Sequence, residues 1–486
     1  MTWDSIKSAP GRMLTYQDFE RAGTENTDAF VYEAIRRHIS SVPVQTALIA
    51  DMYDAQRNKT IMDYVNVVRD VMGRPCSDFI SFDTRIASNF FHRLNTQRVM
   101  YSLGAGVGFI DSSESAEGTD ETKQRLGKYF DHDLQSLAYK ALIHGVAFGM
   151  WNYDRLYCFP LTEFVPLWDE MTGTLRAGIR FWRLDPTRPM QVVLYEEDGY
   201  TRFESVTSSN GSASERLQRT CEKRAYKERV RVVPFEGESE VISSENYSSL
   251  PIVALWGSRL HQSTLVGMRE SIDSYDLIRS GFANDLQECA EVYWLVSNAG
   301  GMSDTDLQQF LDRLKINHVA LVDSDDGGQA QGYTHEIPYA ARKEYLDMIR
   351  AGIYEDFGAL DVHTVEAGAT NDHIDAAYQP MDEEASDFEF QVSEFVMQIL
   401  ALMGIDDTPV FKRQRISNQL EQVQMVAAEA EWLDTETILR KLPNIRADEV
   451  ASILDRKQAE VDDMTIVSAG AAEERAGMTD LAGSNG

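Results

Sequence analysis

The sequence predicts an α+β protein that is mostly helical, and three patterns along the chain support this fold class. Up to about residue 140, apolar residues recur at steps of three and four, as in DAFVYEAIRRHIS, which is typical of helices. From about residue 149, short segments rich in β-branched and aromatic residues, such as RAGIRFWRL and MQVVLYEEDG, predict strands. Beyond about residue 263 the helical spacing returns over long segments. We therefore expect a mixed α/β half followed by an elongated helical region.

The composition limits the classes of function that the chain can have. The chain has 486 residues, of which 43% are hydrophobic and 26% charged, so it can build an ordinary core of two to four folding units. Lys and Arg total 46 and Asp and Glu total 78, which gives a net charge of −32. Wrapping DNA by counterion release needs clustered cations. Any relation to nucleic acid must therefore be local, or must rely on repulsion.

Several motifs that carry chemistry are missing from the sequence. The four cysteines (Cys76, Cys158, Cys221 and Cys289) are scattered without a CxxC pair, which argues against a disulfide scaffold and a thiolate zinc site. There is no GxxxxGK[ST] phosphate loop and no GxSxG nucleophile elbow. No segment has the ~20 uninterrupted apolar residues of a spanning helix, and no apolar signal sequence is apparent. We expect a soluble protein that is not an enzyme, with no catalytic residue, cofactor or metal.

One long apolar stripe predicts a helix of about thirty residues over 263–294, roughly 45 Å long. A stripe of this length needs a partner, which is either another helix or another subunit. Its residues are Leu265, Met268, Ile272, Tyr275, Phe282 and Leu286.

The segments after this helix predict an insert between two helices. Residues 295–337 read as a small α/β unit, and a second helix is expected from Pro338, where proline suits a first helical turn. Residues 358–375 lack a helical period, and another long helix is expected over 376–404. No Lys or Arg occurs between Arg350 and Lys412, although Asp and Glu recur there. Such a stretch is either a solvated acidic face or an acidic lining that repels DNA.

Three segments resemble tailed-phage portal proteins of the siphovirus type. SSLPIVALWGS followed by TLVGMRESIDSYDLIRSGFANDLQECAEVYWLV is similar to the strand and helix that enter the stem of those proteins. EAEWLDTETILRKLPNIRADEVASILDRKQAE resembles the C-terminal pattern of the family, and ALIHGVAFGMWNYDR with LTEFVPLWD resembles part of its wing. The matches span about residues 30 to 465 in the family's order.

The resemblance implies a portal fold assembled as a ring, usually dodecameric, at one capsid vertex. Its axial channel would pass double-stranded DNA during packaging and ejection. The implied regions are an N-terminal α/β wing region at 1–262, a stem helix at 263–294, a clip at 295–337, a second stem helix at 338–357, a tunnel loop at 358–375, a long wing helix at 376–404, and a helical crown with a flexible C-terminal tail at 405–486.

The same resemblance implies roles for particular residues. The stripe over 263–294 becomes the surface on which stem helices of neighbouring subunits pack. The clip residues expected to dock the packaging motor are Asp304, Gln308 and Arg313. The tunnel-loop residues expected to face DNA are Asp361, His363, Glu366, Asn371, Asp372 and His373.

The implied partners are copies of the same chain, the terminase large subunit, a head-completion or adaptor protein, scaffold and major capsid protein, and the DNA in the channel, but no membrane. The implied location is the virion, at the capsid vertex, after assembly in the host cytoplasm. Two other classes stay open. One is another virion structural protein, such as a minor head protein, and the other is an acidic metal-dependent hydrolase that uses His363 and His373.

Overall fold

The structure is a computed structural model. It describes residues 12–64, 67–69, 72–77, 83–111, 118–207, 215–232, 239–288, 293–297, 329–333, 339–361, 371–415, 426–429, 432–441, 453–454 and 456–457. The chain divides into two compact units. The first unit is Met1–Ala359 with Pro380–Gln414, and the second unit is Leu360–Gln379 with Arg415–Gly486.

The N-terminal part of the first unit is helical, as the apolar spacing predicts. The first helix, α2, begins with a capping box. The Thr15 side chain accepts a hydrogen bond from the backbone N–H of Asp18, and the Asp18 carboxylate accepts one from the backbone N–H of Thr15. A short hairpin, β1 with β2, interrupts the helices and was not expected from the sequence. The elements are α2 (Tyr16–Ala22), η1 (Thr24–Asn26), α3 (Thr27–Ile39), α4 (Val42–Asp54), α5 (Lys59–Asp63), β1 (Val67–Arg69), β2 (Pro75–Ser77), α6 (Phe90–Leu103), β3 (Val107–Asp111), α7 (Gly118–Leu126) and α8 (Phe130–His144).

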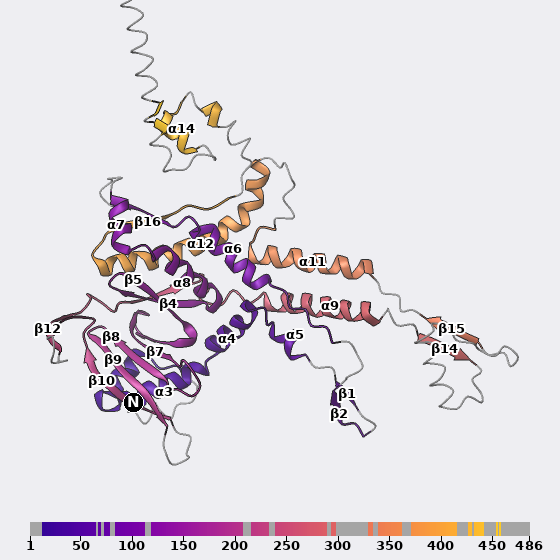
Figure 1. The fold of residues 1–486 in the computed structure, drawn as a ribbon, viewed down its shortest axis with the longest axis horizontal. Helices are drawn as coiled ribbons and strands as arrows, with labels where there is room; N and C mark the ends of the chain where they lie inside the picture. Colours follow the sequence, from indigo (N-terminus) through magenta and orange to yellow (C-terminus); the bar gives the residue numbers. More distant parts are fainter. Residues whose placement is uncertain are drawn as a thin grey trace, which may run out of the picture. The chain divides into compact units, whose positions relative to one another are not determined.

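The strand-rich middle of the chain forms two main antiparallel sheets. One has the order β13-β4-β5, and the other has the order β10-β9-β8-β7-β6. Helix α3 covers one face of the second sheet, as Figure 1 shows for the lower part of the first unit. The elements are β4 (Val146–Asn152), β5 (Arg155–Pro160), η2 (Leu161–Glu163), β6 (Phe164–Trp168), β7 (Leu175–Trp182), β8 (Gln191–Glu196), β9 (Gly199–Thr207), β10 (Glu215–Arg224), β11 (Lys227–Val232), β12 (Ser239–Glu245) and β13 (Ile252–Trp256).

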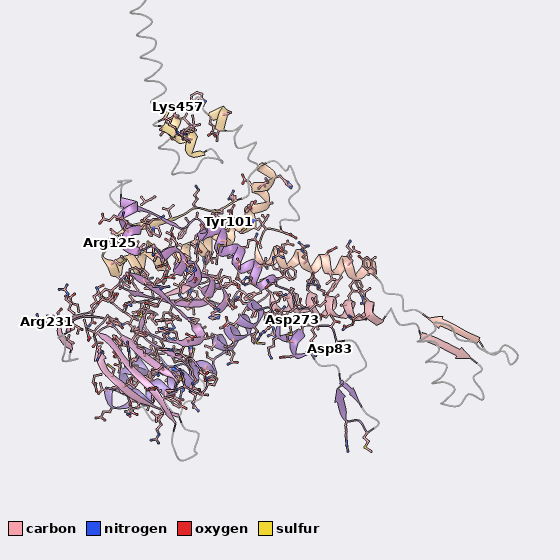
Figure 2. All side chains as sticks on the ribbon, viewed as in Figure 1. Asp83, Tyr101, Arg125, Arg231, Asp273 and Lys457 are labelled. Atoms are coloured by element: carbon pink, nitrogen blue, oxygen red, sulfur yellow. The ribbon has the colours of Figure 1, made fainter. Side chains whose placement is uncertain are left out.

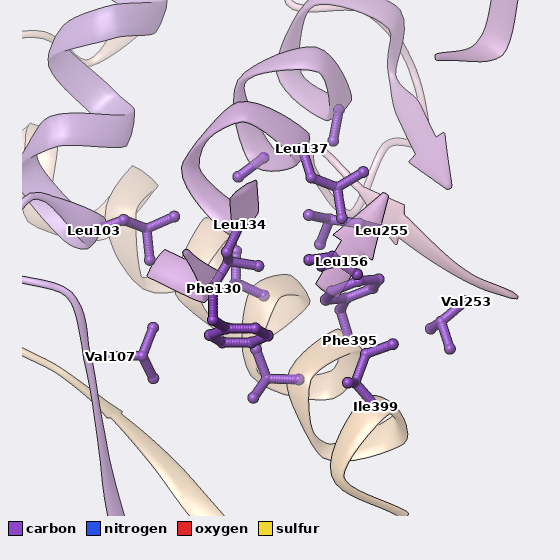
Figure 3. Close-up of a cluster of buried hydrophobic side chains, with 14 of the residues drawn as sticks. Leu103, Val107, Phe130, Leu134, Leu137, Leu156, Val253, Leu255, Phe395 and Ile399 are labelled. Atoms are coloured by element: carbon purple, nitrogen blue, oxygen red, sulfur yellow. The ribbon is translucent and has the colours of Figure 1, made fainter. Parts of the chain in front are cut away.

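A buried apolar cluster packs helices α8 and α12 (Asn371–Met403) against one face of the three-stranded sheet. Phe130 and Leu134 on α8 face Phe395 on α12, and Leu255 on β13 lies among them (Figure 3). These side chains are at most 4% exposed. Residues more than 260 positions apart in the sequence thus share one core, and the C-terminal half of α12 is part of the first unit.

The two helices around the insert form an antiparallel pair. Helix α9 (Arg269–Glu288) and helix α11 (Tyr339–Phe357) lie side by side (Figure 1). The second agrees with the range expected from Pro338, whereas the first has 20 residues and not about thirty. Residues 293–294, expected to be helical, belong to strand β14 (Tyr293–Ser297), which pairs with β15 (Gln329–Tyr333). The apolar spacing did not show where this helix ends, because the apolar residues of the following strand β14 continue the same pattern.

The last part of the chain differs from the expected boundaries in two places. Helix α12 begins at Asn371, five residues before the expected start at 376, and contains Pro380. Strand β16 (Asp407–Phe411) pairs with β3, so residues just after 404 belong to the first unit and not to the C-terminal region. In the second unit, α14 (Thr435–Lys441) is helical, as expected. None of the described helices is both long and apolar enough to cross a membrane.

Candidate functional site

The base of the α9–α11 pair is fixed in the body of the first unit by an apolar cluster. Ile272 of α9 and Ile353 of α11 lie in it with Phe91 of α6, and these residues are at most 1% exposed. Tyr275 packs edge-on against Phe90, with ring centroids 5.0 Å apart. The helix pair is therefore anchored on several elements of its own chain.

This cluster corrects part of the sequence reasoning about the stem. Leu265, Met268 and Ile272 were expected to pack against a neighbouring subunit, but they are buried inside the chain by α11, α4 and α6. Further along α9, Phe282 contacts Tyr339 of α11, with ring centroids 5.8 Å apart, and Leu286 is exposed. The first half of the stripe thus has an intrachain partner, and only its distal part is available for another subunit.

A second, polar face of α9 attaches an N-terminal segment of the chain. The Asp276 carboxylate accepts hydrogen bonds from the Ser88 backbone N–H, at 2.9 Å, and from the side chain of Asn58. Asp273, labelled in Figure 2, accepts a bond from Thr60 at 2.6 Å. Asp276 is fully buried, and burial raises the pKa of its carboxyl group.

The same face continues toward the end of α9. Ser280 accepts the backbone N–H of Ile86 at 3.0 Å, and Asn284 accepts that of Thr84 at 2.9 Å. This face was not predicted from the sequence. Its signal is a row of short polar side chains at helical steps of three and four: Asp273, Asp276, Ser280 and Asn284.

A buried arginine fixes the point where α11 ends. The Arg98 guanidinium of α6 donates to the Phe357 carbonyl at 2.5 Å, lies 4.2 Å from the centre of the Phe357 ring, and pairs with Glu384 of α12 at 3.2 Å. The Arg98 side chain is 9% exposed, and burial lowers its pKa. Gly358 then turns the chain at φ +63, where an added Cβ would meet Glu384 at 2.7 Å. One cation thus joins the end of α11 to α12.

Arginines from other segments pair with several carboxylates in the part of α12 that lies in the first unit. Arg413 pairs with Asp382 at 2.9 Å and with Glu389 at 2.8 Å, and Arg259 pairs with Asp387 at 2.9 Å. The hydrogen bond with Glu389 raises the pKa of Arg413. Tyr101, labelled in Figure 2, also donates to Asp382, at 2.6 Å. The lack of Lys and Arg between 350 and 412 is therefore compensated in part on this segment of α12, and the expected acidic surface is smaller than the sequence indicates.

The residues expected to face DNA or the motor are described only in part. Asp361 is half-buried and His373, on α12, is exposed. Asn371 and Asp372 lie in the first turn of α12, but their side chains are not described. His363, Glu366, Asp304, Gln308 and Arg313 lie outside the described residues. In the described part of the chain, no group of three or more His, Cys, Asp or Glu side chains could hold a metal ion.

Comparison with known proteins identifies the class of protein to which these features belong. The family model for "Phage portal protein, SPP1 Gp6-like" matches residues 50–463, most of the chain. The chain therefore belongs to this family of phage portal proteins, which are structural components of virions and not an enzyme family.

Individual relatives agree with the family. A portal protein of Clostridium phage phiCD119 is 24% identical over 439 residues, which cover 85% of this chain and 92% of that protein. The portal protein of Bacillus phage SPP1 is 24% identical over 212 residues, 40% of this chain and 37% of that protein. A solved structure of the neck of an empty GTA particle aligns with 72% of this chain and 88% of its own, with a TM-score of 0.41 and 8% identity. The family match and the two portal relatives confirm the sequence resemblance to portal proteins.

Proposed function

We propose that copies of this chain form a closed ring at one capsid vertex, and that double-stranded DNA passes through its axial channel during packaging and ejection. The observation that carries the proposal is the portal family match over residues 50–463. The α9–α11 pair supports it, because two antiparallel helices joined by an insert are the stem and clip order that the resemblance implies. In this proposal the helix pair is the stem, and neighbouring copies pack along it.

The exposed apolar residues of the helix pair are the surface on which neighbouring copies would pack. A closed ring presents the two sides of one subunit to its neighbours, so apolar side chains there leave water on assembly. Of the residues expected from the sequence to pack between subunits, this surface includes Leu286. It does not include Leu265, Met268 and Ile272, which are buried inside the chain. Its members are Leu277, Leu286, Tyr339, Tyr345 and Met348.

A matched pair of substitutions tests this surface. Met348, on α11, is 60% exposed, and Met171, in the turn between β6 and β7, is 89% exposed. Met348→Asp places a charge where assembly would desolvate it and should prevent ring formation, whereas Met171→Asp should not. Mass measurement and electron micrographs of the folded variants give the readout. Rings that form equally well with Met348→Asp would contradict the proposed packing surface.

The ends of the channel and its lining are assigned from the resemblance and the order of elements. The insert between the stem helices, 295–337, is proposed as the clip, with Asp304, Gln308 and Arg313 on the surface that docks the terminase. The segment between Gly358 and the start of α12 at Asn371 is proposed as the tunnel loop that contacts DNA transiently. The head-completion protein, scaffold and major capsid protein are the other proposed partners, met at the capsid vertex after assembly in the host cytoplasm.

A further inference from the structure

A cavity of about 420 Å³ lies between the two main sheets of the first unit, away from the helix pair. Strand β5 contributes Tyr157 and Phe159 to one wall, and β7 and β9 contribute Arg180 and Arg202 to the other. The size is within the usual range for sites that bind small molecules or single side chains. None of the features proposed for the channel uses this cavity.

The strand register places the two arginines on one face of the sheet. Arg180 on β7 lies opposite Val193 on β8, and Val193 lies opposite Arg202 on β9. The two arginines are therefore two strand spacings apart, roughly 10 Å between their Cα atoms. Their side chains point to the same side because directly opposite residues share a face.

Aromatic rings hold the two guanidinium groups in separate places. The Arg180 Cζ atom lies 4.3 Å from the centre of the Phe159 ring and 4.6 Å from that of Trp182. The Arg202 Cζ atom lies 5.3 Å from the centre of the Tyr200 ring. A guanidinium that stacks on a ring keeps its N–H edge free for a planar acceptor. The rings thus fix the position of each cation without neutralising it.

No carboxylate of the described residues forms an ion pair with either guanidinium, whereas nearby Arg176 pairs with Glu197 at 3.0 Å. The buried Nε atom of Arg180 has no hydrogen-bond partner among the described residues. Arg180 is half-buried, and a partly buried cation without a carboxylate favours a negatively charged ligand.

The spacing of the arginines favours two carboxylates over one phosphate. A single phosphate binds best where cations converge, but these two guanidinium groups are fixed to different rings on strands β7 and β9. In an extended peptide, side chains at positions i and i+2 lie on one side, roughly 7 Å apart along the strand. This spacing is shorter than the roughly 10 Å between the Cα atoms of the two arginines, and flexible glutamate side chains can cover the difference. Arginine also binds carboxylates in a bidentate, planar geometry.

We propose that this cavity binds two acidic side chains of an extended segment of a partner protein, one on Arg180 and one on Arg202. Recognition of acidic motifs by arginine clusters is a general mode of peptide binding. The site would attach a partner to the wing region of each copy of the chain. This inference does not depend on ring formation, since all lining residues belong to one copy.

Calorimetric titration of the full chain with a short peptide tests the proposal. The probe is acetyl-Glu-Thr-Glu-Thr-Glu-amide, in which alternate glutamates share one side, and the neutral peptide with Gln in place of Glu is its control. We expect one acidic peptide to bind per chain, and the neutral peptide not to bind. Arg202→Gln should weaken binding at least about tenfold, because Arg202 is exposed and its loss removes a charge-assisted contact without disturbing the core.

A second arginine provides the matched control. Arg188 is exposed in the loop between β7 and β8 and does not line the cavity, so Arg188→Gln changes the net charge equally and should leave binding unchanged. Equal weakening by Arg188→Gln and Arg202→Gln would overturn the site, as would no binding of the acidic peptide to the folded chain. Inorganic phosphate that binds in an Arg202-dependent way, without binding of the peptide, would show a small-anion site and would also overturn the proposal.

Discussion

The substitution Arg98→Met tests directly how the end of α11 is held. Methionine fills a similar volume, but it cannot donate to the Phe357 carbonyl or pair with Glu384. Glu384 is 52% exposed, so water can solvate it after the change, whereas the Phe357 carbonyl loses a donor in a buried place. The variant should therefore loosen the end of α11 more than it disturbs the rest of the first unit.

The size of the effect follows from the contacts that are lost. A hydrogen bond to a charged group contributes about 1.5–3 kcal/mol, and a cation over an aromatic ring adds about 0.5–2 kcal/mol. Part of this gain offsets the cost of burying the Arg98 charge, so we expect a net loss of about 2 kcal/mol. Since about 1.4 kcal/mol corresponds to a factor of ten, amides near residue 357 should exchange with solvent about 30 times faster if local opening governs their exchange.

Hydrogen–deuterium exchange read by mass spectrometry on peptides that cover the end of α11 measures this change. Arg93→Met is the matched control, because Arg93 lies exposed on the same helix α6 and forms no described side-chain contact. Exchange in the control should stay close to that of the unchanged chain. Equal exchange in Arg98→Met and Arg93→Met would refute the claim that Arg98 holds this junction.

Three further predictions follow from burial and charge. Ile272→Asp should unfold the first unit, seen as lost helical circular dichroism, because Ile272 is 0% exposed; a folded monomer that only fails to form rings would contradict its intrachain role. Burial lowers the pKa of His38 from 6.5 to about 4, so the unfolded chain binds the proton first on acidification. Stability should therefore fall between about pH 6.5 and 4 by up to about 3 kcal/mol, and His38→Gln should flatten that slope in urea titrations. Asp361→Lys with Glu366→Lys should slow packaging at low salt and partly recover at higher salt, since each phosphate contact adds about 0.9 to the log–log salt slope of DNA binding; a packaging speed without salt dependence would place the loop away from DNA.

Local patterns were sufficient to predict much of the fold. Periodic apolar residues predicted the N-terminal helices, the second helix of the pair and the long helix α12, and turn signals separated the strands from about residue 149. The α+β class and the portal family followed from these elements and from the segments that resemble the family. The hairpin of β1 and β2 was missed because its strands have three residues each, too few to show an alternating pattern.

Long-range contacts explain what the sequence could not predict. The apolar stripe of α9 shows that Ile272 must be covered, but not that Ile353 of the same chain covers it. Likewise, a stretch without Lys or Arg reads as wholly uncompensated charge, because Arg98, Arg259 and Arg413, which pair with some of its carboxylates, lie outside that stretch. Partners that are distant in sequence decide both cases, and no local pattern identifies them.

The central claim is that copies of this chain form a closed ring whose stems pack through the exposed residues of α9 and α11. Cryo-electron microscopy of the purified full chain, with scaffold protein added if assembly requires it, tests this claim most directly. We predict closed rings with an axial opening, in which Met348 and Leu286 lie at the contact between neighbouring stems. A chain that stays monomeric under all these conditions, or rings in which both residues face solvent, would contradict the account.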